Sequence, residues 1–386
     1  MDMGYDPPAN QIVFTSVCKL SFTIQGGYLI LDHNVTVLKT GEKMVIKTVE
    51  PPLGKYSDLV GCWGDIRNDL LTGSMSKTLK VSYYIGEIDK TVVGSMGCYS
   101  PKNTLDIGLV EFVQTDEKHR QKGIASALLG KLINNFRLQK GTALFLCTTN
   151  PIAGNLYEKH GFWYTVGDGM MYVTPESVDF TSTYLSYAGK ARIRHADWGD
   201  LPRASALYNN PDPNWLLKNY LTNSFRDTRF ERHFIQLMQV SRPSGGATLV
   251  LETQTKHVVG LAAFHRLSSF YEQHVGTMTF RICPSYQSQS ADLLRALSNE
   301  AASIGISILQ VQIADCDDQQ KQLVESAGYT ETARLQGHLM DGSKMIDMLI
   351  YTRQVSSKFT KLIGRGNYYG ERQEWQDKRV NTESNN

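Results

Sequence analysis

The sequence predicts a mixed α/β fold built from two successive copies of one domain. The chain has 386 residues, which is more than a single compact core usually holds. Apolar runs with strand-like alternation recur between stretches with helical spacing. Equivalent positions recur at an offset of 167 residues, as in the pairs Gly123 and Ser290, Tyr157 and Val324, and Gly161 and Gly328. A repeat at a fixed offset indicates two copies of one fold.

Composition describes an ordinary globular protein and excludes several classes. Apolar residues make up 41% of the chain and charged residues 20%, and the formal net charge of +2 argues against a dedicated nucleic-acid binder. The N-terminus lacks a signal peptide pattern, and no apolar run is long enough to span a bilayer. The six cysteines include no Cys-x-x-Cys pair, which favours reduced thiols and no metal site. A cytoplasmic protein without nucleic-acid or membrane partners is expected.

The first part of the chain reads as strands and turns. Residues 1–43 alternate apolar and polar positions and form a β-rich extension in this interpretation. The elements expected next are a strand at 44–50, a helical stretch around 55–71, and strands at 80–88 and 91–99 joined by a turn at Asp89-Lys90.

The central part predicts a strand, a polar loop and a helix. The strand spans 105–115 and the helix 123–139, and the loop between them carries Arg120-x-x-Gly123-x-Ala125. Small residues at the start of a helix leave its first N–H groups uncovered, and the helix dipole adds partial positive charge there. Such a turn can hold a diphosphate. An ordinary strand-to-helix turn is the alternative.

A second pattern follows the next strand, expected at 142–148. Asn150 suits a helix N-cap, Pro151 suits the first helical position, and Gly161 suits the left-handed residue that ends the helix. Tyr157 lies two turns after Asn150, so both residues face the same side of this helix. A final strand-like run at 163–173 completes the first copy.

Together the two patterns resemble the GCN5-related N-acetyltransferases, abbreviated GNAT. That family has R/Q-x-x-G-x-G/A at its cofactor loop and N-x-x-A-x-x-L-Y-x-x-x-G-F on the helix that follows. Every fixed position of the second motif is matched here, by Asn150, Ala153, Leu156, Tyr157, Gly161 and Phe162. The resemblance covers residues 44–175 and implies a GNAT-type acyl-CoA N-acyltransferase domain that uses acetyl-CoA as co-substrate and no metal.

The resemblance also implies roles for individual residues. In this family backbone groups of a splayed central strand hold the pantetheine arm, here those of Val113, Gln114 and Thr115. Asn150 and Tyr157 belong to the same cofactor site. The diphosphate would rest on the loop and helix start, formed by Arg120, Gln121, Lys122, Gly123, Ile124, Ala125 and Ser126.

Proton transfer needs an acid and a base. Tyr157 would protonate the departing thiolate, because a phenol keeps its proton at neutral pH, and an aromatic packing role is the alternative. Glu111 is the first candidate for the base, and a structural charge is its alternative. Asp106 is a second candidate, and a chain of water molecules is a third. Some relatives have a glutamate five residues before the motif asparagine, where this chain has Phe145.

The second copy, residues 191–353, lacks the key groups. It follows a linker at 176–190 and has Gln287-x-x-Ser290-x-Asp292 in place of the first loop. An aspartate there would repel a diphosphate. Asp317 and Val324 stand where the first copy has Asn150 and Tyr157. We therefore expect a degenerate domain that shapes the acceptor cleft without binding CoA in the usual way.

Two further features complete the second half. It carries an insertion of about 20 residues within residues 200–240, and a polar tail follows at 354–386. Five aspartates could attract a cationic acceptor or form scattered surface charge, namely Asp315, Asp317, Asp318, Asp341 and Asp347.

The expected function is acetyl-CoA-dependent transfer of an acetyl group to a primary amine of a small or peptide-like molecule. An active first half with a degenerate second half resembles the self-resistance N-acetyltransferases for zwittermicin-, edeine- and paenilamicin-type antibiotics. Two alternatives remain: a protein or lysine N-acetyltransferase, and a non-catalytic acyl-CoA-binding sensor.

Overall fold

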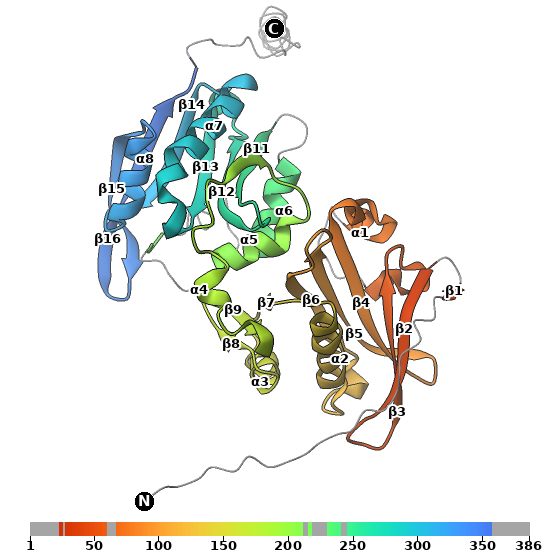
Figure 1. Ribbon diagram of the computed structural model, residues 1–386. Coiled ribbons are helices and arrows are strands. Elements are labelled where there is room, and N and C mark those ends of the chain that lie inside the picture. Colours follow the sequence, from red (N-terminus) through yellow and green to blue (C-terminus); the bar gives the residue numbers. More distant parts are fainter. Residues whose placement is uncertain are drawn as a thin grey trace, which may run out of the picture. The chain divides into compact units, whose positions relative to one another are not determined.

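The computed structural model describes residues 23–25, 28–59, 67–210, 215–217, 230–240 and 245–356 (Figure 1). The chain divides into two compact units. The first unit comprises Met1–Ser76, Val81–Cys98 and Glu111–Asn134, and the second comprises Lys77–Lys80, Tyr99–Val110 and Asn135–Asn386.

The first unit contains most of an antiparallel sheet and one long helix. Strand β2 pairs with β3 and β3 pairs with β4, with registers such as Val35 opposite Val45 and Ile46 opposite Gly86. The predicted strands are confirmed where the structure describes them. The elements that begin in this unit are β1 (Thr23–Gln25), β2 (Tyr28–Val37), β3 (Lys43–Glu50), the 3₁₀ helix η1 (Gly54–Leu59), α1 (Arg67–Thr72), η3 (Ser74–Lys77), β5 (Thr91–Pro101), η4 (Glu117–His119) and α2 (Ile124–Leu138).

Apolar periodicity explains the long helix α2. Its buried side chains recur every three or four positions, which is one face of a helix, and they are Ile124, Leu128, Leu129, Leu132 and Phe136. Strands β4 (Leu79–Ile88) and β6 (Ile107–Thr115) begin in the second unit and end in the first, whereas β5 begins in the first and ends in the second. The predicted boundaries at 43, 175 and 190 stay a prediction.

The second unit holds the rest of the first sheet. Strand β6 pairs in parallel with β7 (Ala143–Cys147), and β7 pairs in antiparallel fashion with β9 (Gly169–Val173). The remaining elements of this part are α3 (Pro151–Lys159), β8 (Trp163–Tyr164), η5 (Pro175–Ser177) and α4 (Phe180–Thr183). The segment predicted as a linker thus contains two short helices, and Phe180, Tyr184 and Leu185 in it are buried.

The second sheet has seven strands, and the described helices that contact its middle strands are α5, α6 and α7. Strand β12 is buried over nearly all its length, and since successive residues point to opposite faces, both faces must be covered. The elements are β10 (Arg192–His195), α5 (Asp200–Tyr208), α6 (Phe230–Val240), β11 (Gly246–Glu252), β12 (Val258–Arg266), η7 (Phe270–Glu272), β13 (Val275–Ile282), η8 (Pro284–Gln289), α7 (Ser290–Ser303), β14 (Ile308–Ala314), α8 (Asp318–Ser326), β15 (Thr330–Asp341) and β16 (Lys344–Gln354).

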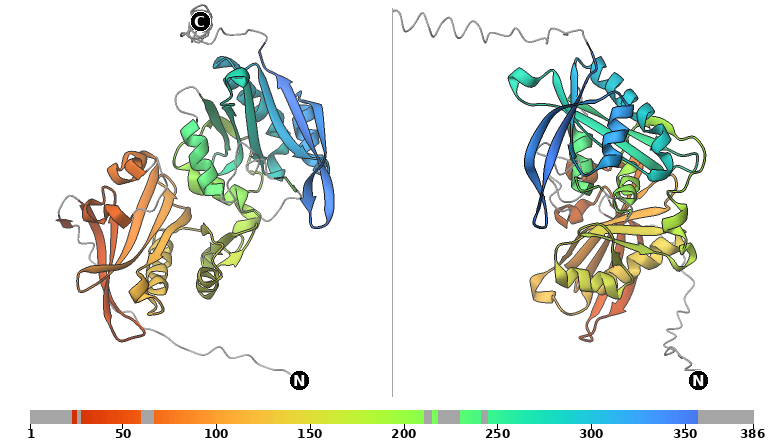
Figure 2. Two further views of the ribbon diagram at one scale, coloured as in Figure 1. Left: turned by 180° about the vertical axis from the view of Figure 1, so that it is seen from behind. Right: turned by 90° about the vertical axis from the view of Figure 1, so that its left-hand side faces the viewer.

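The two sheets share one strand order. Hydrogen-bonded neighbours run β3-β4-β5-β6-β7-β9-β8 in the first sheet and β10-β11-β12-β13-β14-β16-β15 in the second. The last two strands of the second sheet form a long hairpin at its edge, coloured blue in Figure 2. This shared order is consistent with the predicted tandem domains, and the mixed α/β fold class is confirmed. Helices α5 and α6 lie where the insertion was expected, and most of the C-terminal tail lies outside the described residues.

Candidate active site

The backbone conformation and the burial of strand β6 both change in its middle. Its first residues pair with β7, from Ile107 opposite Ala143 to Leu109 opposite Phe145. Phe112 has a φ of +54°, a left-handed conformation that bulky residues adopt rarely and at a cost in free energy. Burial decreases at the same point, because residues 107–111 are buried whereas residues 112–115 are half-buried or exposed. The distortion therefore divides the strand into a core half and an accessible half.

Strand β5 and η1 hold the accessible half of β6. The Gln114 side-chain amide donates hydrogen bonds to the Leu59 carbonyl and the Ser95 hydroxyl, both at 3.0 Å. Gly94 leaves room for this approach, since a Cβ there would lie 2.7 Å from Cγ2 of Ile124 and 3.1 Å from the Gln114 carbonyl oxygen. Gly94 was missed by the sequence analysis. Its only signal was a glycine within a strand-like run.

The loop after β6 contains two more left-handed residues. Gln121 has a φ of +66° and Gly123 a φ of +89°. The first described hydrogen bond of the helix runs from the Ala127 amide to the Gly123 carbonyl at 3.0 Å, so the preceding amides lie at the helix N-terminus. Left-handed residues in such a turn direct successive N–H groups toward one concavity, which favours an anion.

Two basic side chains of the loop, Arg120 and Lys122, are engaged with carboxylates. Arg120 lies 3.2 Å from Glu117, and Lys122 lies 3.0 Å from Glu42. The pKa of Glu42 is lowered, first by a hydrogen bond from Thr40 and then by one from Lys122. These ion pairs are at the surface, where such pairs are weak, so an incoming phosphate could replace the carboxylates.

Helix α3 has the predicted caps. The Asn150 side chain accepts hydrogen bonds from the amides of Ile152 at 2.9 Å and Ala153 at 3.4 Å, and Pro151 occupies the first helical turn. Gly161 has a φ of +88°. The predicted N-cap and C-terminal glycine are therefore confirmed. Gly154 within the helix is also required, because a Cβ there would lie 2.3 Å from the Tyr164 hydroxyl.

Tyr157 and Glu111 are both largely buried. Tyr157 is 4% exposed, and its ring centroid lies 5.8 Å from that of Phe162 in an aromatic cluster with Tyr172. Glu111, 8% exposed, immediately precedes the distortion of β6. Tyr157 therefore packs as an aromatic side chain, and this packing is compatible with a chemical role for its hydroxyl.

Asp106, the second candidate for the base, stands at the start of β6. It precedes the first residue of β6, whereas the loop that carries Arg120 follows the last one. Its carboxylate accepts a short hydrogen bond from the Thr104 hydroxyl and lies 3.9 Å from Nε2 of His257. Asp106 therefore belongs to the opposite end of the strand. Phe145, at the position of the family glutamate, is buried in β7.

The corresponding loop of the second copy has a different backbone. Helix η8 leads directly into α7, and no residue between 284 and 292, all of which the structure describes, is left-handed. The Gln289 side chain bonds the amide and the carbonyl of Ala191, both at 2.9 Å. The Tyr286 hydroxyl accepts a hydrogen bond from the Ala188 amide at 2.8 Å. Side chains of the second loop are thus hydrogen-bonded to the backbone of Ala188 and Ala191.

Asp317, the counterpart of Asn150, binds the inserted segment. Its carboxylate accepts hydrogen bonds from the amides of Leu216 at 2.7 Å and Leu217 at 3.0 Å. Trp215 donates to Gln319 at 2.6 Å. Burial raises the pKa of Asp317, and the two backbone hydrogen bonds oppose that shift. Asn150 therefore caps a helix in the first copy, whereas its counterpart Asp317 accepts hydrogen bonds from the inserted segment in the second.

The other aspartates predicted to attract a cation are mostly ion-paired. Asp315 and Asp347 lie 3.0 and 3.1 Å from Arg334, and Asp318 lies 2.7 Å from Lys321. Their charges are neutralised within the domain, so the alternative of structural or surface charge fits these residues.

Three general features concern the cysteines, metal ligands and helices of the described residues. Cys98, Cys147, Cys283 and Cys316 form no disulfide. Among the residues described, no cluster of three or more histidine, cysteine, aspartate or glutamate side chains could hold a metal ion. None of the helices in the described ranges has the length and apolarity needed to cross a bilayer.

The protein family whose sequence model matches part of this chain is consistent with this geometry. Residues 55–162 match the model of the Acetyltransferase (GNAT) family. The matched stretch is less than half of the chain and contains β6, the loop with Gly123, and α3. It defines the class of protein: an enzyme of the acetyltransferase type. No curated protein matches the chain.

Several solved structures are similar to part of the chain. The ribosomal-protein-alanine N-acetyltransferase of Brucella melitensis is 23% identical, covering 42% of this chain and 99% of its own, with a TM-score of 0.36. The protein yncA of Salmonella typhimurium, solved with its cofactor acetyl-CoA, is 21% identical, with coverages of 44% and 96% and a TM-score of 0.37. A phosphinothricin acetyltransferase of Sinorhizobium meliloti, in complex with acetyl-CoA, is 14% identical, with coverages of 47% and 96% and a TM-score of 0.40.

Proposed function

We propose that this protein transfers the acetyl group of acetyl-CoA to a primary amine of a small or peptide-like molecule. The observation that carries the proposal is the left-handed turn at Gln121 and Gly123, directly before α2 and inside the matched segment. A helix N-terminus with such a turn binds a diphosphate through backbone amides. The second copy has the same helix without this turn.

The chemistry needs four contributions from the chain. Backbone groups of Val113, Gln114 and Thr115 would hold the pantetheine arm, because the distortion at Phe112 leaves this half of β6 accessible. The neutral amine attacks the thioester carbonyl, and backbone donors stabilise the developing oxyanion. The ammonium proton passes to Glu111 or to water, and Tyr157 protonates the departing thiolate.

The test is an acetylation assay that measures CoA thiol release with a panel of amines. Tyr157→Phe should lower kcat about 100-fold and leave the KM for acetyl-CoA within about twofold, because only the proton donor is lost. Tyr172→Phe is the matched control, since it removes a hydroxyl from the same aromatic cluster. An unchanged kcat in Tyr157→Phe would remove the general-acid assignment.

The same assay separates the alternatives. A protein or lysine acetyltransferase would acetylate peptides and not small amines, and an acyl-CoA sensor would bind acetyl-CoA and release no thiol with any acceptor. For the acceptor we propose an amine-rich antibiotic. Expression in a sensitive bacterium should then raise the inhibitory concentration of such a compound, and Tyr157→Phe should abolish the increase. Four cysteines without disulfides favour a reducing compartment, which we propose is the cytoplasm.

A further inference from the structure

A cavity of about 370 Å³ lies within the second unit, at the N-terminal ends of β6 and β7. Asp106 and Thr142, which line it, precede these two strands. The rest of its wall comes from residues 176–184 and from His257, the residue before β12. Its volume is at the lower end of the range of small-molecule sites. Arg120 and Gly123 follow the other end of β6 in the chain, and the cavity shares no lining residue with the proposed acetyl-CoA site.

The geometry of His257 determines which of its ring nitrogens carries hydrogen. Nδ1 lies 2.8 Å from the backbone carbonyl oxygen of Tyr184, which can only accept, so Nδ1 must donate. The ring stacks on that of Tyr184 with centroids 3.8 Å apart. Burial lowers the pKa of His257, which favours the neutral ring. Nε2 then presents a lone pair toward Oδ2 of Asp106 at 3.9 Å. Two acceptors face each other, and a donor that reaches both would satisfy them.

Tyr184 is another residue of the wall, and its hydroxyl has an unusual environment. Tyr184 is 5% exposed, and its hydroxyl has no hydrogen-bond partner among the described residues. Burial raises the pKa of Tyr184 well above its usual value, so the hydroxyl keeps its proton. A buried polar group without a partner costs free energy, which a bound polar ligand would recover.

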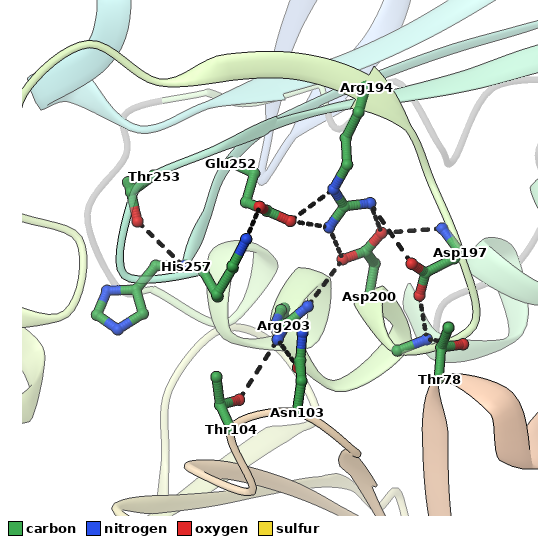
Figure 3. Close-up of polar contacts among 12 residues, drawn as sticks. Thr78, Asn103, Thr104, Arg194, Asp197, Asp200, Arg203, Glu252, Thr253 and His257 are labelled. Atoms are coloured by element: carbon green, nitrogen blue, oxygen red, sulfur yellow. Dashed lines mark hydrogen bonds and ion pairs between the residues drawn. The ribbon is translucent and has the colours of Figure 1, made fainter.

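The charge in the wall is negative. Of the three carboxylates lining the cavity, Glu176 is ion-paired with Arg137 at 2.5 Å, which leaves Asp106 and Asp179. The nearby Arg203 donates to Asn103 at 2.5 Å and lies 3.4 Å from Asp200, as Figure 3 shows. Arg203 shares Asp200 with Arg194, which lies 2.6 Å from that carboxylate, and among the described contacts Arg203 forms no ion pair with Asp106.

We propose that this cavity binds a small organic ammonium ion. The ammonium group donates to Oδ2 of Asp106 and to Nε2 of His257, and a second polar group of the ligand meets the Tyr184 hydroxyl. The proposal concerns binding alone and does not depend on acetyl transfer, so it stands or falls separately from the proposed function.

The test is calorimetric titration of the full chain with 1,4-diaminobutane, in the absence of acetyl-CoA. We expect saturable binding, and none of comparable strength for 1,4-butanediol, which has the same chain length without charge. Tyr184→Phe keeps the ring that stacks on His257 and removes only the hydroxyl, so it should weaken binding about fivefold to tenfold. Asp106→Asn, which removes the charge at nearly constant size, should weaken it at least as much.

Two matched controls keep the result specific. Tyr187→Phe removes a hydroxyl three residues away from a side chain that is 62% exposed, and Asp89→Asn removes one exposed charge outside the cavity. Both should bind the diamine like the unaltered protein, and thermal unfolding should show that all four variants are folded. Absence of diamine binding, equal binding of the diol, or binding that survives both Tyr184→Phe and Asp106→Asn would overturn the proposal.

Discussion

The loops at 116–126 and 284–292 occupy corresponding places in the two copies and differ in their backbone. The first contains left-handed residues at Gln121 and Gly123, and its amides precede a 15-residue helix. The second is a 3₁₀ helix that leads into α7 without a left-handed residue, and its Gln289 is bonded to Ala191. One loop can therefore accept an anion, whereas the other is part of the domain's own packing.

A buried ion pair, in contrast, is present in both copies. Lys47 on β3 pairs with the buried Glu87 on β4 at 2.5 Å, and Arg194 on β10 pairs with the buried Glu252 on β11 at 2.5 Å. Arg194 follows Lys47 by 147 residues, the offset that also separates Ile46 from Ile193. The comparison teaches that an ion pair that supports the fold is present in both sheets, whereas the groups proposed to hold the cofactor are replaced in the second.

The largest expected effect tests the retained ion pair. Glu252→Gln should lower the free energy of unfolding by about 3 kcal/mol, because Arg192, Arg194 and Lys256 lose the buried carboxylate that they share. Arg194 keeps its second partner, Asp200, at 2.6 Å. Urea unfolding measures this free energy, and Glu87→Gln is the matched variant in the first copy. Because this ion pair is expected to support only the fold, the KM for acetyl-CoA should stay within about twofold in Glu252→Gln. A tenfold rise would contradict the separation of fold-supporting groups from cofactor-binding groups.

The lowered pKa of Glu252 predicts that the stability of the protein depends on pH. Burial works to raise the pKa of Glu252, but hydrogen bonds from Arg192, Arg194 and Lys256 outweigh it and lower the pKa from 4.5 to about 2. A lowered folded pKa stabilises the protein above the unfolded pKa, and this stability is lost as the pH falls toward 2. Unfolding midpoints at pH 7 and pH 3 should therefore differ less in Glu252→Gln than in the unaltered protein. An identical pH response in both would exclude this role.

A medium effect is expected from making the first loop resemble the second. Ala125→Asp introduces the counterpart of Asp292, and a carboxylate beside the diphosphate should raise the KM for acetyl-CoA about 30-fold, roughly 2 kcal/mol. Ala125→Asn has the same size without the charge and should raise it much less. Equal effects of the two substitutions would show that size and not charge distinguishes the loops.

The smallest effect is expected in the second loop. Asp292→Ala removes only a surface ion pair with Arg295, so the free energy of unfolding should change by about 0.5 kcal/mol or less. The KM for acetyl-CoA should not change. Steady-state kinetics and urea unfolding check both values, and a changed KM would show that the second loop does contact the cofactor.

Much of the first copy was predictable because its signals are local. The caps of α3 at Asn150 and Gly161 follow from residue type, and the apolar face of α2 follows from spacing. The distortion at Phe112 was not predictable, because nothing in a phenylalanine favours a left-handed backbone. The buried Phe180 and Tyr184 were also missed, because the segment around them is polar in composition and reads as a linker.

The sequence by itself determined the class of fold and the segment that carries the acetyltransferase motifs, because these depend on periodicity, capping and spacing along the chain. The repetition of the fold stays a prediction with which the two sheets are consistent. Only the tertiary structure decided what the replaced groups of the second copy do. The Asp317 carboxylate accepts hydrogen bonds from the Leu216 and Leu217 amides, and the Gln289 side chain is bonded to Ala191. Tyr184, in the segment predicted as a linker, lines a cavity with Asp106 and His257. These contacts join residues that are tens of positions or more apart, and no local pattern encodes such distances.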